Sequence, residues 1–235
     1  MAALQEAIEV DQQEMKVAAA HAVLDDVRSG MALGLGTGST ATEFVKLLGE
    51  AIASKKLSNL RCTCTSSKTE ALAKSVGIAI SNLADIAPLD LAVDGADEID
   101  GILRLIKGRG GALLREKIVE QAAKRFIVIA DDTKLVERLG VGVLPVEVTP
   151  FALDVLTARF TSLGLKPVLR MQDGTPRVTD EGHRILDVRV PGHTDIADIV
   201  AQIRDNAGVV ETGFFPREAT EAVIATPNGI KRMKR

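Results

Sequence analysis

The chain has 235 residues, of which 46% are hydrophobic and 26% charged, enough to bury one large core or two smaller ones without disulfides. Its net charge of −3 and its lack of Trp and Tyr exclude a general attraction to nucleic acid and aromatic platforms for single strands. No apolar stretch approaches the roughly 20 residues that span a bilayer, and residues 1–10 do not form a secretory signal. We expect a cytoplasmic protein with no membrane and no nucleic-acid partner.

Strand and helix patterns alternate through the first 139 residues. Short apolar runs predict strands, and apolar residues at helical spacing predict helices between them. The expected strands are 31–35, 60–65, 89–93, 103–106 and 126–130, and the expected helices are 17–27, 41–52, 68–75 and 113–124. The run 126–130 is almost continuously apolar, as is typical of parallel strands buried on both faces. This order predicts an α/β fold with a doubly wound, mostly parallel, Rossmann-like sheet.

From residue 140 the order of expected elements changes. Strands at 143–148, 166–171, 184–190 and 209–214 combine with helices at 151–163 and 195–206. The resulting βαββαβ order is that of a ferredoxin-like α+β unit, with a central hairpin marked by Asp173-Gly174. A further apolar strand at 222–225, followed by a turn at 227–229, is expected to return to the first sheet. We therefore predict an α/β catalytic domain of residues 1–139 and 215–235, with 140–214 inserted as a lid or oligomerisation domain.

The cysteines and histidines do not form a metal-binding pattern. Cys62 and Cys64 are two residues apart on an expected strand, a spacing that disfavours a disulfide and indicates reduced thiols. His21, His183 and His193 are scattered and match no zinc-binding spacing. We expect no metal and no organic cofactor.

The glycine-rich segment 34–40 lies between an expected strand and an expected helix. Backbone N–H groups and hydroxyls at such a turn can surround a phosphate. The segment is not a dinucleotide fingerprint, because Ser39 occupies the third glycine position and no acid stands about 20 residues onward. It is not a triphosphate-binding loop either, because no lysine follows Gly38. The alternative to a phosphate site is a capping box between Thr40 and Glu43.

An acidic turn and a basic, glycine-rich loop follow further along the chain. The acidic turn, 94–98, comes directly after an apolar strand, and the basic loop, 107–111, precedes a helix that carries Glu116. Glu116 falls outside the apolar stripe that we assign to this helix from Leu114, Ile118, Val119 and Ala122, so core packing does not explain it. Taken alone, the acidic turn fits a solvated turn and Glu116 fits a surface ion pair.

Five polar segments converge in this prediction. Segments 66–69 and 131–134 also follow expected strands, as do 34–40 and 94–98. Open α/β sheets bind ligands at the carboxyl edge of their strands. The convergence of these segments with the loop 107–111 therefore predicts a small-molecule site at that edge.

Three motifs together resemble ribose-5-phosphate isomerase of type A. They are Gly-Thr-Gly-Ser-Thr at 36–40, Val-Asp-Gly-Ala-Asp-Glu-Ile at 93–99, and the segment from Lys107 to Ile118. The resemblance runs over nearly the whole chain, including 144–148 and the Thr-Pro-Asn-Gly sequence at 226–229. It implies interconversion of ribose 5-phosphate and ribulose 5-phosphate in the non-oxidative pentose phosphate pathway, without a cofactor, by a homodimer or homotetramer.

The resemblance also implies a set of site residues. The active-site positions match Asp94, Asp97, Lys107 and Glu116, and the positions around the sugar phosphate match Lys16, Thr37, Ser39, Thr40 and Lys134. The glycines of the same loops, Gly36, Gly38, Gly108, Gly110 and Gly111, complete the expected substrate-binding set. We expect Glu116 to move a proton between C2 and C1 through a cis-enediolate, and Lys107 to stabilise its oxyanion. Asp94 is expected to open the sugar ring and Asp97 to orient it, although these two roles can be exchanged.

Two other functions fit parts of the same pattern. The first is a related sugar-phosphate deaminase or lactonase, which the lack of a histidine near the acids disfavours. The second is a non-catalytic phosphosugar sensor. No helix-turn-helix precedes Gly34, so a sensor would need a separate DNA-binding partner.

Overall fold

A computed structural model describes residues 2–192 and 194–235, with side chains from residue 12 onward. Its main sheet has six strands in the order β15-β14-β6-β3-β1-β2. Five of them run parallel, and β15 is antiparallel to β14 at one edge. The strands are β1 (Ala32–Leu35), β2 (Arg61–Cys64), β3 (Leu91–Asp94), β6 (Phe126–Asp131), β14 (Glu221–Thr226) and β15 (Gly229–Lys234). The predicted doubly wound, mostly parallel sheet is confirmed.

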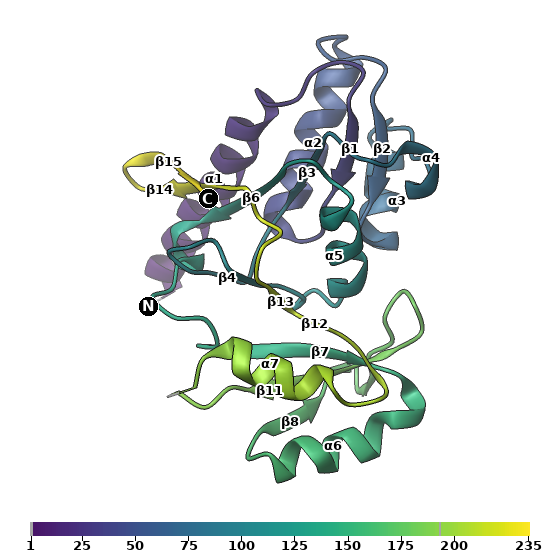
Figure 1. Ribbon diagram of the computed structural model, residues 1–235. Helices are drawn as coiled ribbons and strands as arrows, with labels where there is room; N and C mark the ends of the chain where they lie inside the picture. The colour runs from purple at the N-terminus through teal and green to yellow at the C-terminus, as the bar shows by residue number, and fades with distance from the viewer. Residues whose placement is uncertain (1, 193) are drawn as a thin grey trace.

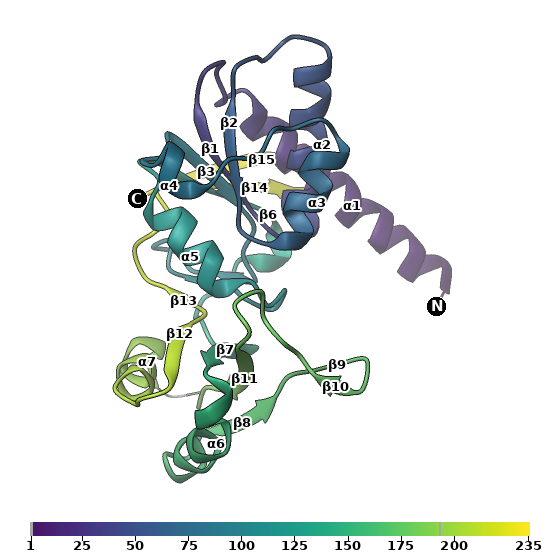
Figure 2. The same ribbon diagram turned by 90° about the vertical axis from the view of Figure 1, so that its right-hand side faces the viewer.

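Helices cover both faces of this sheet (Figures 1 and 2). The first three pack through a large apolar cluster on one face, and α4 and α5 pack on the other. They are α1 (Ala2–Leu24), α2 (Ser39–Ala53), α3 (Ser67–Ser75), α4 (Leu83–Ile86) and α5 (Leu113–Gln121). The strands β1, β3 and β6 are buried along their whole length, which explains their continuous apolar sequences.

A small antiparallel sheet lies beside α5, in the order β13-β5-β4. Its strands are β4 (Glu98–Ile99), β5 (Leu105–Ile106) and β13 (Phe214–Phe215). The strand predicted at 103–106 therefore exists in shortened form, but it belongs to this sheet and not to the main one. Leu103 has a left-handed φ of 62°, so the extended backbone begins only after it.

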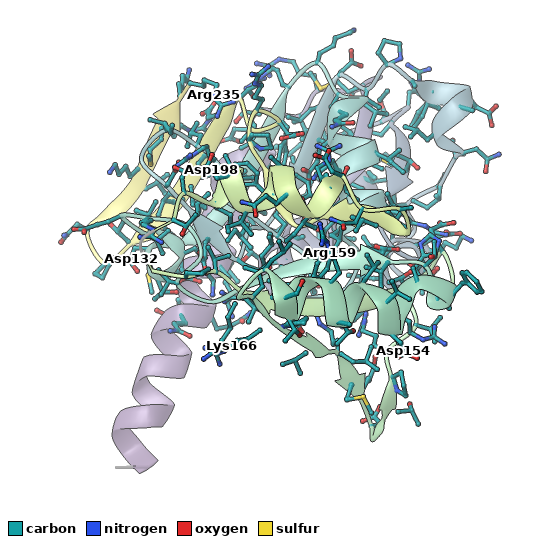
Figure 3. The ribbon with its side chains drawn as sticks, turned by 60° about the horizontal axis from the view of Figure 1, so that its bottom comes forward. Asp132, Asp154, Arg159, Lys166, Asp198 and Arg235 are labelled. Carbon is teal, nitrogen blue, oxygen red and sulfur yellow. The ribbon has the colours of Figure 1, made fainter. Side chains whose placement is uncertain are left out.

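The second unit is a four-stranded antiparallel sheet in the order β12-β7-β11-β8. Its elements are β7 (Val143–Val148), α6 (Leu153–Ser162), β8 (Lys166–Leu169), β11 (Arg184–Arg189), α7 (Ile196–Arg204) and β12 (Val209–Thr212). When the four strands are numbered by their order in the chain, they run 4-1-3-2 across the sheet. Both helices pack on its apolar core. This arrangement is the predicted ferredoxin-like unit. Charged side chains on its exposed faces include Asp154, Arg159, Lys166 and Asp198 (Figure 3).

Several local predictions are corrected. The first helix ends at Leu24 rather than 27. The helix predicted from residue 151 begins as a 3-10 turn, η2 (Pro150–Ala152), before α6. The sequence pattern also missed the second strand of the C-terminal hairpin, because β15 is exposed along most of its length and has no alternating apolar face. A short hairpin, β9 (Met171–Gln172) and β10 (Thr175–Pro176), turns at Asp173-Gly174 as predicted. No helix among the described residues is long and apolar enough to cross a bilayer.

Candidate active site

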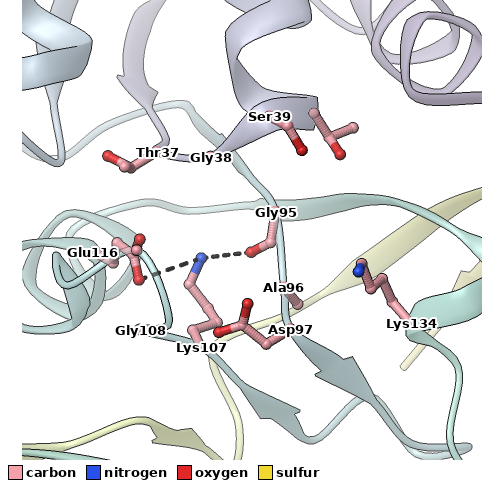
Figure 4. A pocket seen from close by; sticks show the side chains of 12 residues that line it. Thr37, Gly38, Ser39, Gly95, Ala96, Asp97, Lys107, Gly108, Glu116 and Lys134 are labelled. Carbon is pink, nitrogen blue, oxygen red and sulfur yellow. Dashed lines mark hydrogen bonds and ion pairs between the residues drawn. The ribbon is translucent and has the colours of Figure 1, made fainter. Parts of the chain in front are cut away.

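A cavity of about 130 Å³ opens at the carboxyl ends of the parallel strands (Figure 4). Four of the predicted polar loops meet there: those that follow β1, β3, β5 and β6. The cavity is lined by Thr37, Gly38, Ser39, Thr40, Gly95, Ala96, Asp97, Lys107, Gly108, Gly110, Glu116 and Lys134. Most of the residues expected at the substrate therefore surround one space.

The glycine turn after β1 forms one wall. Gly38 is the N-cap of α2, with a φ of 123° and no side-chain cap. The alternative to a phosphate site, a capping box between Thr40 and Glu43, does not form, because α2 begins at Ser39 and Glu43 pairs with Lys46 instead. The start of α2 is thus left open towards the cavity, where N–H groups and the helix dipole favour an anion. Lys134, from the 3-10 turn η1 (Asp132–Lys134), adds a cation to the same cavity.

A cluster of hydroxyl groups holds Thr37 in place. Its Oγ1 lies 2.7 Å from Thr65 Oγ1, 2.8 Å from Ser66 Oγ and 3.0 Å from Thr69 Oγ1. The predicted polar segment 66–69 therefore does not line the cavity but supports a residue that does. It also caps α3, since Ser66 accepts a hydrogen bond from the backbone N–H of Thr69.

The two acids of the turn after β3 have different surroundings. Asp94 is 1% exposed and does not line the cavity. Its Oδ1 accepts hydrogen bonds from the N–H groups of Thr37 and Gly95, at 2.9 and 2.6 Å. Gly36 is required beside it, because a Cβ there would lie 2.2 Å from the Asp94 carboxyl. Asp97, in contrast, is half-buried and lines the cavity, so it is the acid of this pair that a ligand in the cavity can touch.

Lys107 is fully enclosed in a cage of acceptors. Its Nζ lies 2.5 Å from the carbonyl oxygen of Gly95, 2.9 Å from Asp94 Oδ2, 3.1 Å from Glu120 Oε1 and 3.7 Å from Glu116 Oε2. Burial alone would lower the pKa of this ammonium, but attraction to the three carboxylates outweighs burial and raises the pKa. Lys107 is therefore a fixed positive charge at the cavity wall.

Glu116 and Glu120 both project from α5 towards Lys107. Burial, opposed by Lys107 and reinforced by Asp94 and Asp97, raises the pKa of Glu116 to about 8. Burial also raises the pKa of Glu120 well above its usual range, again opposed by Lys107. Of the two, only Glu116 lines the cavity. A buried carboxyl that titrates near neutrality beside a permanent cation is suited to general acid–base chemistry.

The orientation predicted for α5 was wrong. Its buried residues are Leu113, Glu116, Lys117, Val119 and Glu120, whereas Ile118, assigned to the apolar stripe, is 47% exposed. Lys117 is satisfied by the carbonyl oxygens of Thr212 and Phe214, at 2.8 and 2.7 Å. The buried side of this helix is therefore largely ionic, and an amphipathic pattern could not reveal it.

Some expected site residues lie away from the cavity wall. Lys16 is half-buried on α1 and is not among the lining residues. Gly111 supports the loop instead: its φ is 80°, and a Cβ there would lie 2.2 Å from Arg177 Nε. Sequence reasoning missed Glu120, although its spacing of one helical turn from Glu116 was a usable signal. It also missed Arg170 and Arg177 of the second unit, which donate hydrogen bonds to carbonyl oxygens of the loop 107–111. Nothing in the local sequence connects these arginines to the loop.

The described residues contain no group of three or more His, Cys, Asp or Glu side chains that could hold a metal ion. Cys62 and Cys64 are free thiols, as predicted. His183 lies 2.9 Å from Glu147 in the second unit, away from the cavity lining. His193 lies outside the described residues.

Comparisons with known proteins agree on one family. A family model for ribose 5-phosphate isomerase A (phosphoriboisomerase A) matches residues 61–229. The ribose-5-phosphate isomerase A of Sinorhizobium medicae is 45% identical over 233 residues, covering 96% of this chain and 99% of the relative. A solved D-ribose-5-phosphate isomerase in complex with phospho-erythronic acid has a TM-score of 0.90 and 39% identity, covering 94% of this chain and 98% of that one. The isomerase from Methanocaldococcus jannaschii has a TM-score of 0.89 and 35% identity, covering 95% of this chain and 100% of that one.

Proposed function

The chain belongs to the ribose 5-phosphate isomerase A family and interconverts ribose 5-phosphate and ribulose 5-phosphate, and we propose that it does so through a cis-enediolate with Glu116 as the base. The observation that carries this proposal is the position of Glu116. Its carboxyl reaches the cavity with a pKa raised to about 8, chiefly by burial, and Lys107 Nζ lies 3.7 Å from it.

The phosphate of the substrate binds at the start of α2. The exposed turn at Gly38 and Ser39 presents backbone N–H groups to the cavity, and Lys134 adds a positive charge. Both features favour a dianion at this position. Binding the phosphate there fixes the far end of the sugar and holds C1 and C2 against Glu116.

Ring opening is assigned to Asp97. Its Oδ2 accepts a hydrogen bond from the N–H of Arg109 at 2.8 Å, and its carboxyl lines the cavity. The carboxylate takes the proton of the anomeric hydroxyl and passes it to the ring oxygen as the bond between C1 and the ring oxygen breaks, so that the C1 aldehyde forms. The burial of Asp94 behind Lys107 supports a different role for that acid, which is to hold the ammonium and the Thr37 turn in place.

Proton transfer then follows along one face of the open sugar. The Glu116 carboxylate removes the C2 proton, the electron pair forms the C1–C2 double bond, and O1 becomes an oxyanion. Lys107 stabilises this charge, and a preorganised donor of this kind is commonly worth about 3 kcal/mol. Glu116 returns the proton to C1 while the O2 proton moves to O1, so that the C2 carbonyl and the C1 hydroxyl of the ketose form. The phospho-erythronic acid bound by the related isomerase supports this route, since an open-chain carboxylate resembles an enediolate in planarity and charge.

We also propose a cytoplasmic homodimer or homotetramer in which residues 140–214 form a separate domain. Free Cys62 and Cys64 support a reducing compartment. Phe151 in η2 and Val155 in α6 are 100% and 72% exposed, and exposed apolar side chains of this kind support an interface between subunits. The molar mass in solution tests the assembly.

The test of the reaction is incubation of the purified protein with ribose 5-phosphate in the presence of a chelator. We expect ribulose 5-phosphate to form. Release of ammonia from an amino-sugar phosphate, or hydrolysis of a sugar-phosphate lactone, without isomerisation would indicate the related deaminase or lactonase. Binding of the sugar phosphate without turnover would indicate a sensor.

A further inference from the structure

An arginine of the second unit reaches the active-site loop. Arg170 follows β8, and its Nε and Nη2 form a two-pronged pair with the carboxylate of Asp187 on β11, with Nε at 2.8 Å from Oδ2. Its remaining nitrogen, Nη1, donates to the carbonyl oxygen of Gly108 at 2.6 Å and to that of Arg109 at 3.0 Å. The Arg170 side chain is 12% exposed, so these contacts form with little competition from water.

The peptide group between Gly108 and Arg109 connects this arginine to the cavity. Its carbonyl oxygen accepts from Arg170, and its N–H donates to Asp97 Oδ2 at 2.8 Å. A peptide group is planar, with its C=O and N–H pointing in opposite directions, so fixing one end fixes the other. Gly108 has a φ of 100°, which permits this orientation at little steric cost.

We propose that Arg170, held by Asp187, is a positioning residue that directs the Arg109 N–H at Asp97 and so prepares this carboxylate for ring opening. The inference rests on the role given to Asp97 above. It assigns the second unit a part in the reaction, because the residue that sets the peptide belongs to that unit. A cation on the carbonyl oxygen also polarises the peptide, which strengthens the hydrogen bond from its N–H.

The surroundings of Asp97 support this role. Burial raises the pKa of Asp97, and the Arg109 N–H opposes the rise more than any other neighbouring group. The charged groups around this carboxyl are the Arg109 guanidinium, Lys107, Lys134 and Glu116. Loss of the directed N–H should therefore raise the pKa of Asp97 further.

The test compares variants of two arginines that join the second unit to the rest of the chain, Arg170 in the second unit and Arg115 on α5. Arg170→Gln removes the guanidinium cation, its paired hydrogen bonds to Asp187 and its hydrogen bond to the Gly108 carbonyl oxygen. Asp187→Asn leaves Arg170 in the chain but weakens its anchor, and it serves if the first variant does not fold. Arg115→Gln is the matched control, because Arg115 bridges α5 to Glu181 in the second unit at 2.6 Å without touching the 108–109 peptide.

Two readouts separate positioning of Asp97 from a general structural role. The first compares ribose 5-phosphate turnover with deuterium uptake at C1 of ribulose 5-phosphate. This ketose has no free 5-hydroxyl with which to form a furanose, so uptake needs the base but no ring opening. The second readout is the pKa of Asp97, followed through the ¹³C signal of its carboxyl, which needs no catalysis.

We expect Arg170→Gln to lower kcat/KM for ribose 5-phosphate about tenfold, within the ~10²-fold that a small misplacement can cost. Deuterium uptake should stay within about twofold, and the pKa of Asp97 should rise. Asp187→Asn should change both readouts in the same direction, and Arg115→Gln should change neither.

Three results would overturn the inference: an Arg170→Gln enzyme that matches the Arg115→Gln control, equal losses in turnover and uptake, or an unchanged pKa of Asp97. An Asp97→Asn enzyme with full turnover would refute the ring-opening role instead. In that case, the carboxyl titration in Arg170→Gln still decides whether the arginine positions Asp97.

Discussion

Helices α2 and α5 both border the cavity, but their buried faces have opposite chemistry. The buried residues of α2 are mainly apolar, with Phe44, Val45 and Leu48 fully enclosed. The buried face of α5 contains Glu116, Lys117 and Glu120. Burial of apolar side chains stabilises a fold, whereas burial of charged groups costs stability unless they are paired. In the proposed reaction, α2 therefore supports the site through its apolar packing and presents its open end to the phosphate, while α5 supplies the reactive groups.

The largest effect is expected from Glu116→Gln on α5. The amide keeps the size of the side chain but cannot accept the C2 proton, so turnover should fall by at least about 10²-fold, the low end of what a positioned base contributes. Ligand affinity should remain within a few-fold, because the proposed phosphate contacts are the start of α2 and Lys134 and do not include Glu116. Steady-state kinetics measure the turnover, and titration of the variant with ribulose 5-phosphate measures the ligand affinity. A variant with near-normal turnover would remove α5 from the chemistry.

The charged face of α5 also predicts a pH dependence. The base must be ionised, and the pKa of Glu116 is raised to about 8, mainly by burial. Below this pKa the carboxylate fraction falls about tenfold per pH unit, so kcat/KM should drop at acid pH and level off above about 8. A pH–rate profile of the free enzyme reports this group. A profile that is flat from pH 6 to 9 would contradict the ionisation state assigned to Glu116.

Lys134, which faces the cavity near the start of α2, is the next position to change. Lys134→Ala should lower kcat/KM for ribose 5-phosphate about tenfold, because phosphate binding holds the reacting carbons in place. The poor reaction of unphosphorylated ribose should change little. The comparison of kcat/KM for the two sugars isolates the phosphate contact. If both sugars lose the same proportion of activity, Lys134 does not contact the phosphate.

The apolar face of α2 should respond in stability rather than in chemistry. Phe44 is fully buried, so Phe44→Leu should lower the free energy of unfolding by about 1–2 kcal/mol. Its kcat/KM should stay within about twofold of the natural chain at a temperature where both are folded. Denaturant titration and kinetics on the same sample give both numbers. A large loss of turnover would mean that α2 does more than support the turn.

The smallest effect is expected from metal removal. The sequence has no metal-ligand spacing, and the enediolate route needs no Lewis acid. Activity after exhaustive chelation should equal the untreated activity. A chelated enzyme that needs Mg²⁺ or Mn²⁺ for recovery would favour a metal-assisted hydride shift.

The same contrast explains what the sequence could predict. The order of strands and helices predicted the main sheet and the four-stranded sheet, because most of their elements carry their own periodicity and short loops limit the topology. The position of α2 was predictable because its buried face is apolar. The orientation of α5 was not, since its buried acids are stabilised by Lys107, which no periodicity links to them.

The site was also predictable only where local sequence motifs mark it. The glycine loops and the acids around the cavity stand in recognisable motifs, so sequence placed them together at one edge. The different surroundings of Asp94 and Asp97 depend on the fold of the turn, and the reach of Arg170 crosses 62 positions to Gly108. Side-chain contacts at such separations are fixed by tertiary packing, and a single sequence does not report them.

In the proposed mechanism, Glu116 moves the proton between C2 and C1. Deuterium uptake at C1 of ribulose 5-phosphate in heavy water measures this transfer without requiring ring opening. We predict that Glu116→Gln abolishes the uptake, whereas Asp97→Asn retains it while losing turnover of ribose 5-phosphate. Uptake at a near-natural rate in Glu116→Gln would contradict the account.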